Sequence, residues 1–270
     1  MSKITISKAF LILLATVGIC RAGECTKDVC LQSREKVQAC PVEQILKQLK
    51  KETKELNSYH GRIEHLSRQP ELFDSKTLRK GDLYYEKSNG KSKLRINFET
   101  LKQDDEKEQK YREEYIFDGI WLTQIDYQIK QANRYQLAEP NEPVDAFDLA
   151  AKNFPIIGFA RIEDLNKDFE IKLFEEKENE PSQFIRLHLK VKPDSAYKDD
   201  YTSFEFWIDK KLNLPAQIVA VTTEEDISQV KLLKPQVNKK LKEGVFDFKI
   251  PKGFAVSQKT QINSRGKQGD

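Results

Sequence analysis

The stretch GDLYYEKSNGKSKLRINF, residues 81–98, has the pattern of two β-strands joined by a tight turn. Apolar and polar residues alternate on both sides of Asn89-Gly90, with apolar positions at Leu83, Tyr85, Leu94, Ile96 and Phe98. An Asn-Gly pair between two alternating runs is a strong hairpin signal. The basic residues of the second strand fall on its other face, so we expect one apolar face and one solvated face.

The same two-residue period recurs along most of the chain and predicts the fold class. We expect further strands in residues 59–63, 115–117, 120–137, 169–173, 185–191, 204–208, 218–220 and 246–250. About ten such strands describe a mainly β protein of the α+β class, with a large antiparallel sheet that is dry on one face. Residues 101–112 and 175–181 are densely charged and predict loops.

Two segments have helical rather than strand-like patterns. PVEQILKQLKKETKEL, residues 41–56, has apolar residues at spacings of three and four and a proline suited to a first helical turn. Residues 142–165 lean towards helix and interrupt the strands in mid-chain. Two helical elements and one wide sheet predict a single domain over residues 41–257, followed by a disordered tail over residues 258–270.

The N-terminus resembles a secretory signal peptide over residues 1–22. Lys3 and Lys8 precede an apolar run of about a dozen residues, and the small Ala22 precedes Gly23. Cleavage there would leave 43 basic and 43 acidic residues, from 46 and 43 in the whole chain. A neutral balance argues against a nucleic-acid partner. Because the signal peptide directs export, we expect a periplasmic location.

All four cysteines lie in the first forty residues. After export, a pair such as Cys25 or Cys30 with Cys40 could form a disulfide in the Cys-containing segment 23–40. Cys20 follows Ile19 rather than a small residue, which disfavours lipidation without excluding it.

The sequence contains no recognisable catalytic or metal-binding pattern. On a strand, His60 and His65 would point to opposite faces, and His188 occupies a polar alternate position. The sequence contains no nucleophile elbow, Gly-rich phosphate loop, HExxH or CxxC. We expect no enzymatic activity, no metal and no cofactor.

The remaining candidate for function is apolar surface, to which 15 Phe, 9 Tyr and 2 Trp contribute. A sheet of this width has more apolar area than two modest helices can cover, so it must curl on itself, dimerise or enclose a ligand. The sequence leaves open, for each candidate residue, whether its side chain packs in the core or contacts a ligand. The candidate cavity residues are Leu46, Leu49, Leu83, Tyr85, Leu94, Ile96, Phe98, Phe117, Trp121, Phe204, Phe206 and Ile208.

Four segments, in order, resemble landmarks of the periplasmic lipoprotein carrier family represented by LolA. They are LNSYHGRIEHL, KGDLYYEK, EYIFDGIWLTQID and FDFKIPKGFAV. Asp118-Gly119 and the F-x-F-x-x-P pattern of Phe246, Phe248 and Pro251 carry most of the resemblance, which covers about Val42 to Val256.

This resemblance implies an incomplete antiparallel barrel closed by a helical lid, with acyl chains in its apolar cavity. It implies a monomer that carries acylated lipoproteins or lipids from an inner-membrane release complex to an outer-membrane acceptor. A basic residue after the GDL motif, arginine in many members, helps to hold the lid; the matching position here is Lys87. Lysine keeps the charge but lacks arginine's planar fork of donors.

Two other interpretations share this fold. One is an envelope sensor that binds lipid or protein ends and signals to a membrane partner. The other is a membrane-anchored acceptor resembling LolB, attached through Cys20.

Overall fold

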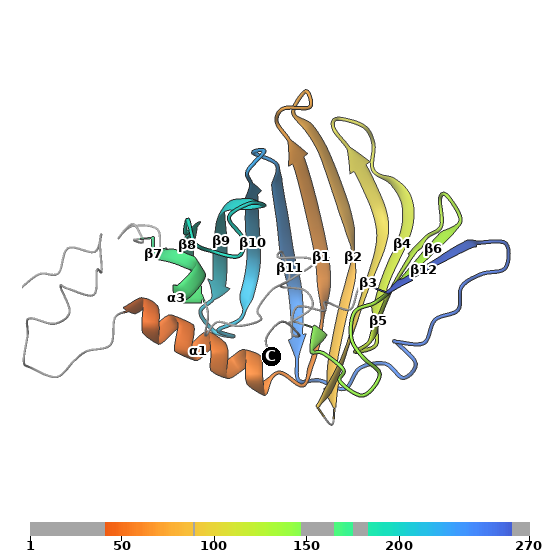
Figure 1. Cartoon of the computed structure of the whole chain (residues 1–270), viewed down its shortest axis with the longest axis horizontal. Helices are drawn as coiled ribbons and strands as arrows, with labels where there is room; N and C mark the ends of the chain where they lie inside the picture. Colours follow the sequence, from red (N-terminus) through yellow and green to blue (C-terminus); the bar gives the residue numbers. More distant parts are fainter. Residues whose placement is uncertain (1–40, 89, 147–164, 175–182, 261–270) are drawn as a thin grey trace, which may run out of the picture.

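The computed structural model describes residues 41–88, 90–146, 165–174 and 183–260. In this part of the chain, twelve strands form one curved sheet (Figure 1). The strands are β1 (Ser58–Gln69), β2 (Ser75–Ser88), β3 (Lys91–Gln103), β4 (Gln109–Phe117), β5 (Trp121–Asp126), β6 (Gln131–Gln136), β7 (Phe169–Leu173), β8 (Phe184–Val191), β9 (Tyr201–Asp209), β10 (Pro215–Thr222), β11 (Ile227–Val237) and β12 (Ala255–Thr260).

The order of strands in space is β12-β6-β5-β4-β3-β2-β1-β11-β10-β9-β8-β7. All neighbouring pairs are antiparallel except β12, which lies parallel to β6. The β1–β11 pair joins an N-terminal and a C-terminal half in the middle of the sheet. Among the described residues nothing pairs β7 with β12, so the sheet is curved and unclosed. The expected mainly β fold with an incomplete barrel is confirmed.

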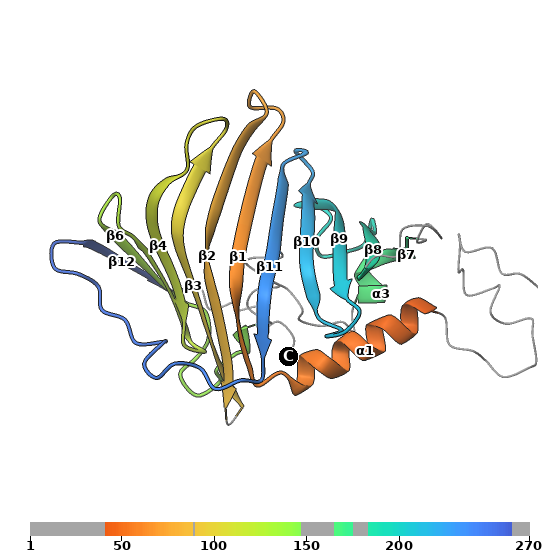
Figure 2. The same cartoon turned by 180° about the vertical axis from the view of Figure 1, so that it is seen from behind.

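Helix α1 (Pro41–Glu55) forms where the three- and four-residue spacing predicted it. It lies across one end of β7–β11, as both views show (Figures 1 and 2). Leu46 and Leu49 are buried beneath it, while its lysines and glutamates face away. The short α3 (Leu165–Asp168) precedes β7. Neither of the two described helices has the length and apolar character needed to span a bilayer.

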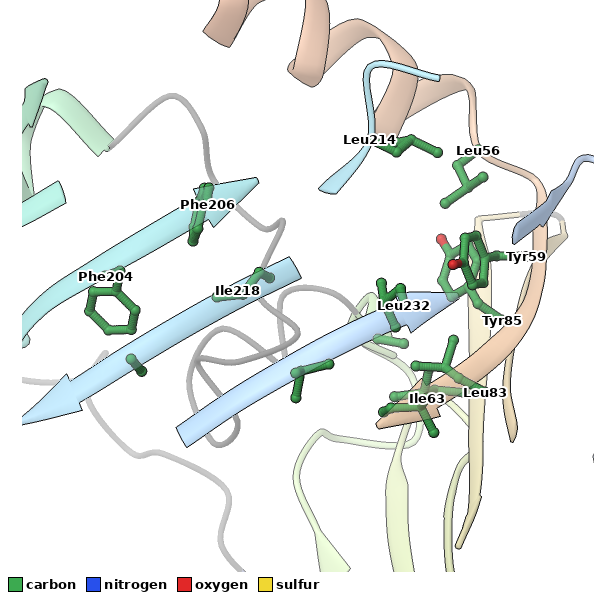
Figure 3. Packing of buried hydrophobic residues seen from close by; sticks show 14 of the residues in the cluster. Leu56, Tyr59, Ile63, Leu83, Tyr85, Phe204, Phe206, Leu214, Ile218 and Leu232 are labelled. Carbon is green, nitrogen blue, oxygen red and sulfur yellow. The ribbon is translucent and has the colours of Figure 1, made fainter. Parts of the chain in front are cut away.

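The two faces of the sheet carry different clusters. We call the face that packs against α1 the inner face. Its buried core extends from β5 to β7 in the order of strands, and Figure 3 shows part of it. The opposite, outer face has a small cluster of Ile116, Ile125 and Ala132. Strand alternation explains this division, because successive side chains point to opposite faces.

The outer cluster is covered by the segment between β11 and β12, residues 238–254, which we call the strap. Phe248, Ile250 and Phe254 of the strap pack against it. The prediction of a strand over residues 246–250 is therefore wrong: these residues have no strand partner, and their alternation comes from packing one side of an irregular segment against the sheet.

Other segment predictions also need correction. Residues 101–103 and 109–112 lie in β3 and β4, so the predicted charged loop narrows to the hairpin tip at residues 104–108. β11 and β12 were not predicted, and β12 extends to Thr260, past the expected start of the tail. The expected signal peptide, the cysteines, most of the second helical segment and residues 175–181 lie outside the described residues.

Candidate functional site

The inner face gathers most of the residues that the sequence indicated. Eleven of the twelve candidates belong to its buried cluster, with exposures between 0% for Tyr85 and 7% for Leu94. They come from α1 and from the four strands β2, β3, β4 and β9: Leu46, Leu49, Leu83, Tyr85, Leu94, Ile96, Phe98, Phe117, Phe204, Phe206 and Ile208. Figure 3 shows Leu83, Tyr85, Phe204 and Phe206 within this cluster.

The exception is Trp121, which lies on the outer face. In β5 its neighbour Leu122 is opposite Tyr135 and joins the inner cluster. Trp121 has the opposite parity and packs under the guanidinium of Arg134, whose Cζ is 4.8 Å from the ring centroid. Two adjacent apolar residues cannot share one face of a strand, so assigning Trp121 to the inner face from hydrophobicity alone was wrong.

Lys87, the candidate lid latch, forms an ion pair at the end of β2. Its Nζ lies 3.3 Å from Oδ2 of Asp145, which also accepts a 3.4 Å hydrogen bond from the hydroxyl of Tyr85. Lys87 is about one-third exposed and Asp145 about one-fifth, so this pair is partly screened by water. It connects the inner face of β2 to the chain that follows β6.

The residues around Asp145 are fixed by further contacts. The amide of Ala146 donates a 2.6 Å hydrogen bond to the buried Ser92 hydroxyl, and the amide of Val144 donates one of 2.9 Å to the carbonyl of Gly119. Val144 and Ala146 also pack against the inner cluster. Segment 143–146 is therefore a cover over the inner face, tied to β2, β3 and the β4–β5 turn.

The Asp-Gly landmark has a structural role in this arrangement. Oδ1 of Asp118 accepts hydrogen bonds from the amides of Ile120 (3.0 Å) and Trp121 (2.8 Å), which shapes the turn between β4 and β5. This turn also places the Gly119 carbonyl where it accepts the hydrogen bond from the amide of Val144. This landmark thus positions the cover rather than contributing a side chain to the inner face.

A polar network that the sequence did not reveal lies on the inner face beside the apolar cluster. Glu113 of β4 accepts hydrogen bonds from Arg79 (2.8 Å), Tyr115 (2.7 Å), Tyr111 (3.1 Å) and Gln124 (2.8 Å). Its side chain is only 4% exposed. The one signal in the sequence was parity: Glu113, Tyr115 and Phe117 alternate along β4 and so share a face.

The network is ionised at neutral pH. Burial would raise the pKa of Glu113, but hydrogen bonds from Tyr115 and Gln124 and the charge of Arg79 lower it below its usual value. Burial, then the charge of Glu113, raises the pKa of Tyr111 to about 12. Arg79 and Glu113 therefore carry opposite charges that balance, while the phenols stay neutral.

His65 lies next to this network, directly opposite Arg79 on the neighbouring strand. Burial, followed by the charge of Arg79, lowers its pKa to about 4. Its Nε2 is 2.8 Å from the hydroxyl of Ser228. His60 lies on the outer face, stacked on Tyr84, so the two histidines do not share a site. Across the described ranges, no three His, Cys, Asp or Glu side chains gather to hold a metal ion.

A groove of about 650 Å³ lies on the outer face, away from the apolar cluster. It is lined by the start of β1, one residue each from β2 and β3, and residues 238–247 of the strap. Its lining includes both lysines and acidic residues. The strap is held there by Arg95, which donates 2.8 Å hydrogen bonds to the carbonyls of Val245 and Asp247.

Comparison with known proteins finds similar folds but no similar sequences. No protein-family model matches the chain, and neither does any curated protein. An uncharacterized conserved protein from Thermus thermophilus is 11% identical with a TM-score of 0.46, covering 81% of this chain and 99% of that one. A MucB structure is 12% identical with a TM-score of 0.47, covering 78% of this chain and 64% of that one.

A LolA superfamily protein from Nitrosomonas europaea is also among the similar structures. It is 11% identical with a TM-score of 0.32, covering 78% of this chain and 99% of that one. In the MucA/MucB complex of Pseudomonas aeruginosa the identity is 14% and the TM-score 0.44, with 78% of this chain and 62% of that one covered. This chain thus spans less than two thirds of the MucB chains, and all these likenesses concern the fold alone.

Proposed function

We propose that this protein is an exported carrier that binds lipids or lipidated proteins by their acyl chains on the inner face, for transfer toward the outer membrane. The observation that carries the proposal is the one-sided apolar cluster of an unclosed sheet. It extends over β5, β4, β3, β2, β1, β11, β10, β9, β8 and β7. Outside the sheet and its loops, its described partners are helix α1, Leu165 of α3 and the cover segment 143–146.

The size of the hydrophobic effect suits such a role. Each methylene removed from water contributes about 0.8 kcal/mol, so a sixteen-carbon chain in water represents roughly 12 kcal/mol of unfavourable exposure. Only an extended apolar surface that excludes water can offset that cost. The inner cluster provides this kind of surface, with Phe98, Phe204 and Phe206 among its largest side chains.

The ion pair of the cover is weak, which suits reversible binding. Ion pairs as exposed as Lys87–Asp145 contribute about 1 kcal/mol or less. The cover is also attached by two hydrogen bonds, from Ala146 to Ser92 and from Val144 to Gly119, and by the packing of Val144 and Ala146. A carrier requires such a cover to open in order to load and release cargo. A ligand then shifts the equilibrium between the closed and the open cover only by the difference between its affinities for these two states.

Mass spectrometry of the exported full chain tests the proposal. After gentle purification we expect bound acyl-bearing molecules, and after delipidation we expect uptake of a dipalmitoyl lipopeptide. An empty protein that also fails to bind the lipopeptide would overturn the proposal. Capture from envelope extracts of a transmembrane regulator alone, without lipoproteins, would favour the sensor interpretation instead.

Two neighbouring positions of β10 give a matched pair of variants. Ala220 is fully buried on the inner face, whereas Val219 has the opposite parity and is partly exposed. Ala220→Leu adds volume where the acyl chain would lie, so it should reduce lipopeptide uptake several-fold. Val219→Leu should leave uptake unchanged. Thermal unfolding of both variants checks that the fold is retained.

A further inference from the structure

The polar network occupies one end of the inner face, where the apolar cluster stops. Phe98 is the boundary residue, because it belongs to the apolar cluster and also contacts the network. Its ring lies 5.2 Å from the guanidinium of Arg79 and packs edge-on against Tyr115, with the centroids 6.3 Å apart. A molecule whose chain lies along the apolar cluster and ends at Phe98 would therefore meet Arg79 there.

Hydrogen bonding within the network is complete for the carboxylate but not for the guanidinium. Glu113 accepts from four donors, which occupy both of its oxygens. Nε of Arg79 is buried and has no hydrogen-bond partner among the described residues. Buried donors are normally paired, so an orphaned N–H at this boundary is a feature that a ligand acceptor would satisfy.

The net charge of the network restricts the kind of acceptor. Arg79 and Glu113 form an ion pair with Arg79 23% exposed and Glu113 4% exposed, and the adjacent His65 is neutral at pH 7. An uncharged acceptor can bind Arg79 without upsetting this balance. A carboxylate would add an uncompensated negative charge close to Glu113 in a poorly solvated place, which is costly.

We propose that Arg79, Glu113, Tyr111, Tyr115 and Gln124 recognise the head of the ligand and select an uncharged ester or amide carbonyl next to the acyl chain over a free carboxylate. This inference rests on the proposed acyl-binding function and names its ligand class. Acylglycerols and the acylated ends of lipoproteins both carry such carbonyls, whereas free fatty acids do not.

The experiment compares ligands with the same chain and different heads. Delipidated full-length protein competes a fluorescent acyl probe with monopalmitoylglycerol, a dipalmitoyl lipopeptide or palmitate, at pH 7 and below micelle-forming concentrations. We expect the ester to bind about tenfold more tightly than palmitate, a difference equivalent to about 1.4 kcal/mol. Equal affinity for monopalmitoylglycerol and the lipopeptide would point to recognition of the carbonyl that they share. A higher affinity for the lipopeptide would point to protein cargo. Both results agree with the proposal.

The Glu113→Gln variant provides the sharpest test. It leaves the charge of Arg79 without its partner, so the preference should shift towards palmitate by about tenfold or more. Glu114→Gln is the matched control, since Glu114 is the next residue, 4% exposed and paired with Arg95 at 2.8 Å, but on the outer face. That variant should keep the wild-type preference.

The possible failures are distinguishable. If no acyl ligand binds at all, the proposed function fails. If acyl ligands bind but the ester-to-carboxylate ratio is the same in wild type and Glu113→Gln, or shifts equally in Glu114→Gln, the network is only structural and this inference is overturned. A loss of fold would lower affinity for all ligands alike and would not reverse their order, so the ratio remains informative.

Discussion

His65 is a buried histidine whose neutral form is favoured by the fold. Its pKa falls to about 4 through burial and the nearby charge of Arg79, against which the charge of Glu113 acts. The unfolded chain binds the proton with an ordinary pKa of about 6.5. Between these values the unfolded state holds more protons, so stability decreases as the pH falls through this window.

This linkage gives a pH prediction. Lowering the pH from 7 to 5 should reduce the free energy of unfolding by about 2 kcal/mol through His65 alone. His65→Gln, which retains a nitrogen able to contact Ser228, should lose most of that dependence. Urea unfolding at the two pH values measures it. An unchanged pH dependence in the variant would show that His65 is accessible to protons in the fold.

Gly81 lies where β2 and β3 approach closely at an irregularity in their register. A Cβ atom at this position would overlap the backbone carbonyl of Asn97, which belongs to the partner strand and cannot rotate away. Gly81→Ala should therefore destabilise the fold by about 3 kcal/mol.

Gly253→Ala is the comparison variant. Gly253 has a φ of +84° with no atom within 4 Å of an added Cβ, so only backbone strain opposes the change. It should cost about 1 kcal/mol. Thermal unfolding of both variants tests the difference. Equal effects would mean that the β2–β3 register can shift to admit a side chain at position 81.

At the scale of elements, the cover segment 143–146 and strand β2 are coupled through Lys87 and Asp145. Lys87→Met should reduce global stability by less than about 1 kcal/mol, because the pair is partly exposed. Locally, the amides of Val144 and Ala146 should exchange hydrogen faster, since the cover loses one of its attachments. Hydrogen exchange resolved by peptide measures this effect.

The charge-reversed double variant is the control for this prediction. Lys87→Glu with Asp145→Lys should restore slow exchange of the cover, whereas either single reversal should not. Unchanged hydrogen exchange of the cover in Lys87→Met, in both single reversals and in the double variant would mean that the hydrogen bonds to Ser92 and Gly119 hold the cover without help from Lys87.

The sequence predicted elements well where a single face was buried. β1–β3 and β8–β10 alternate cleanly, and α1 has its apolar stripe, because each of these elements contributes buried apolar residues to one cluster only. β11 was missed since lysines and Pro235 interrupt its pattern, although its pairing with β1 and β10 is long. Residues 246–250 alternate like a strand because the strap also has one covered side.

The same reasoning explains which candidate-site residues could be predicted. Parity identified Leu83 and Phe206 because hydrophobicity and burial agree there. It failed for Trp121, where both faces of β5 are covered. Glu113 and Arg79 could not be found, since a charged residue on a strand normally indicates solvent. Only the ion pair that they form across β3, between β4 and β2, offsets the cost of burying them.

For the whole molecule, the unclosed sheet implies a gradient of stability from its centre to its edges. β1, β2 and β11 are each flanked by two neighbours, whereas β7 and β12 are edge strands in the described part of the chain. β12 is mostly exposed and is fixed mainly by β6 and by the strap before it. We therefore expect amides of the central strands to exchange only by global unfolding and those of the edges by local opening.

Phe254 tests how the strap contributes to this gradient. It packs edge-on against Tyr127, with the ring centroids 5.4 Å apart, and immediately precedes β12. Phe254→Ala should destabilise the fold by about 2 kcal/mol and accelerate exchange in β12 and β6, leaving β7 unchanged. Val256→Ala, at a 57% exposed position, should do neither. If exchange in β7 rose equally, the two edges would be coupled through the whole sheet, and the sheet would open as one unit.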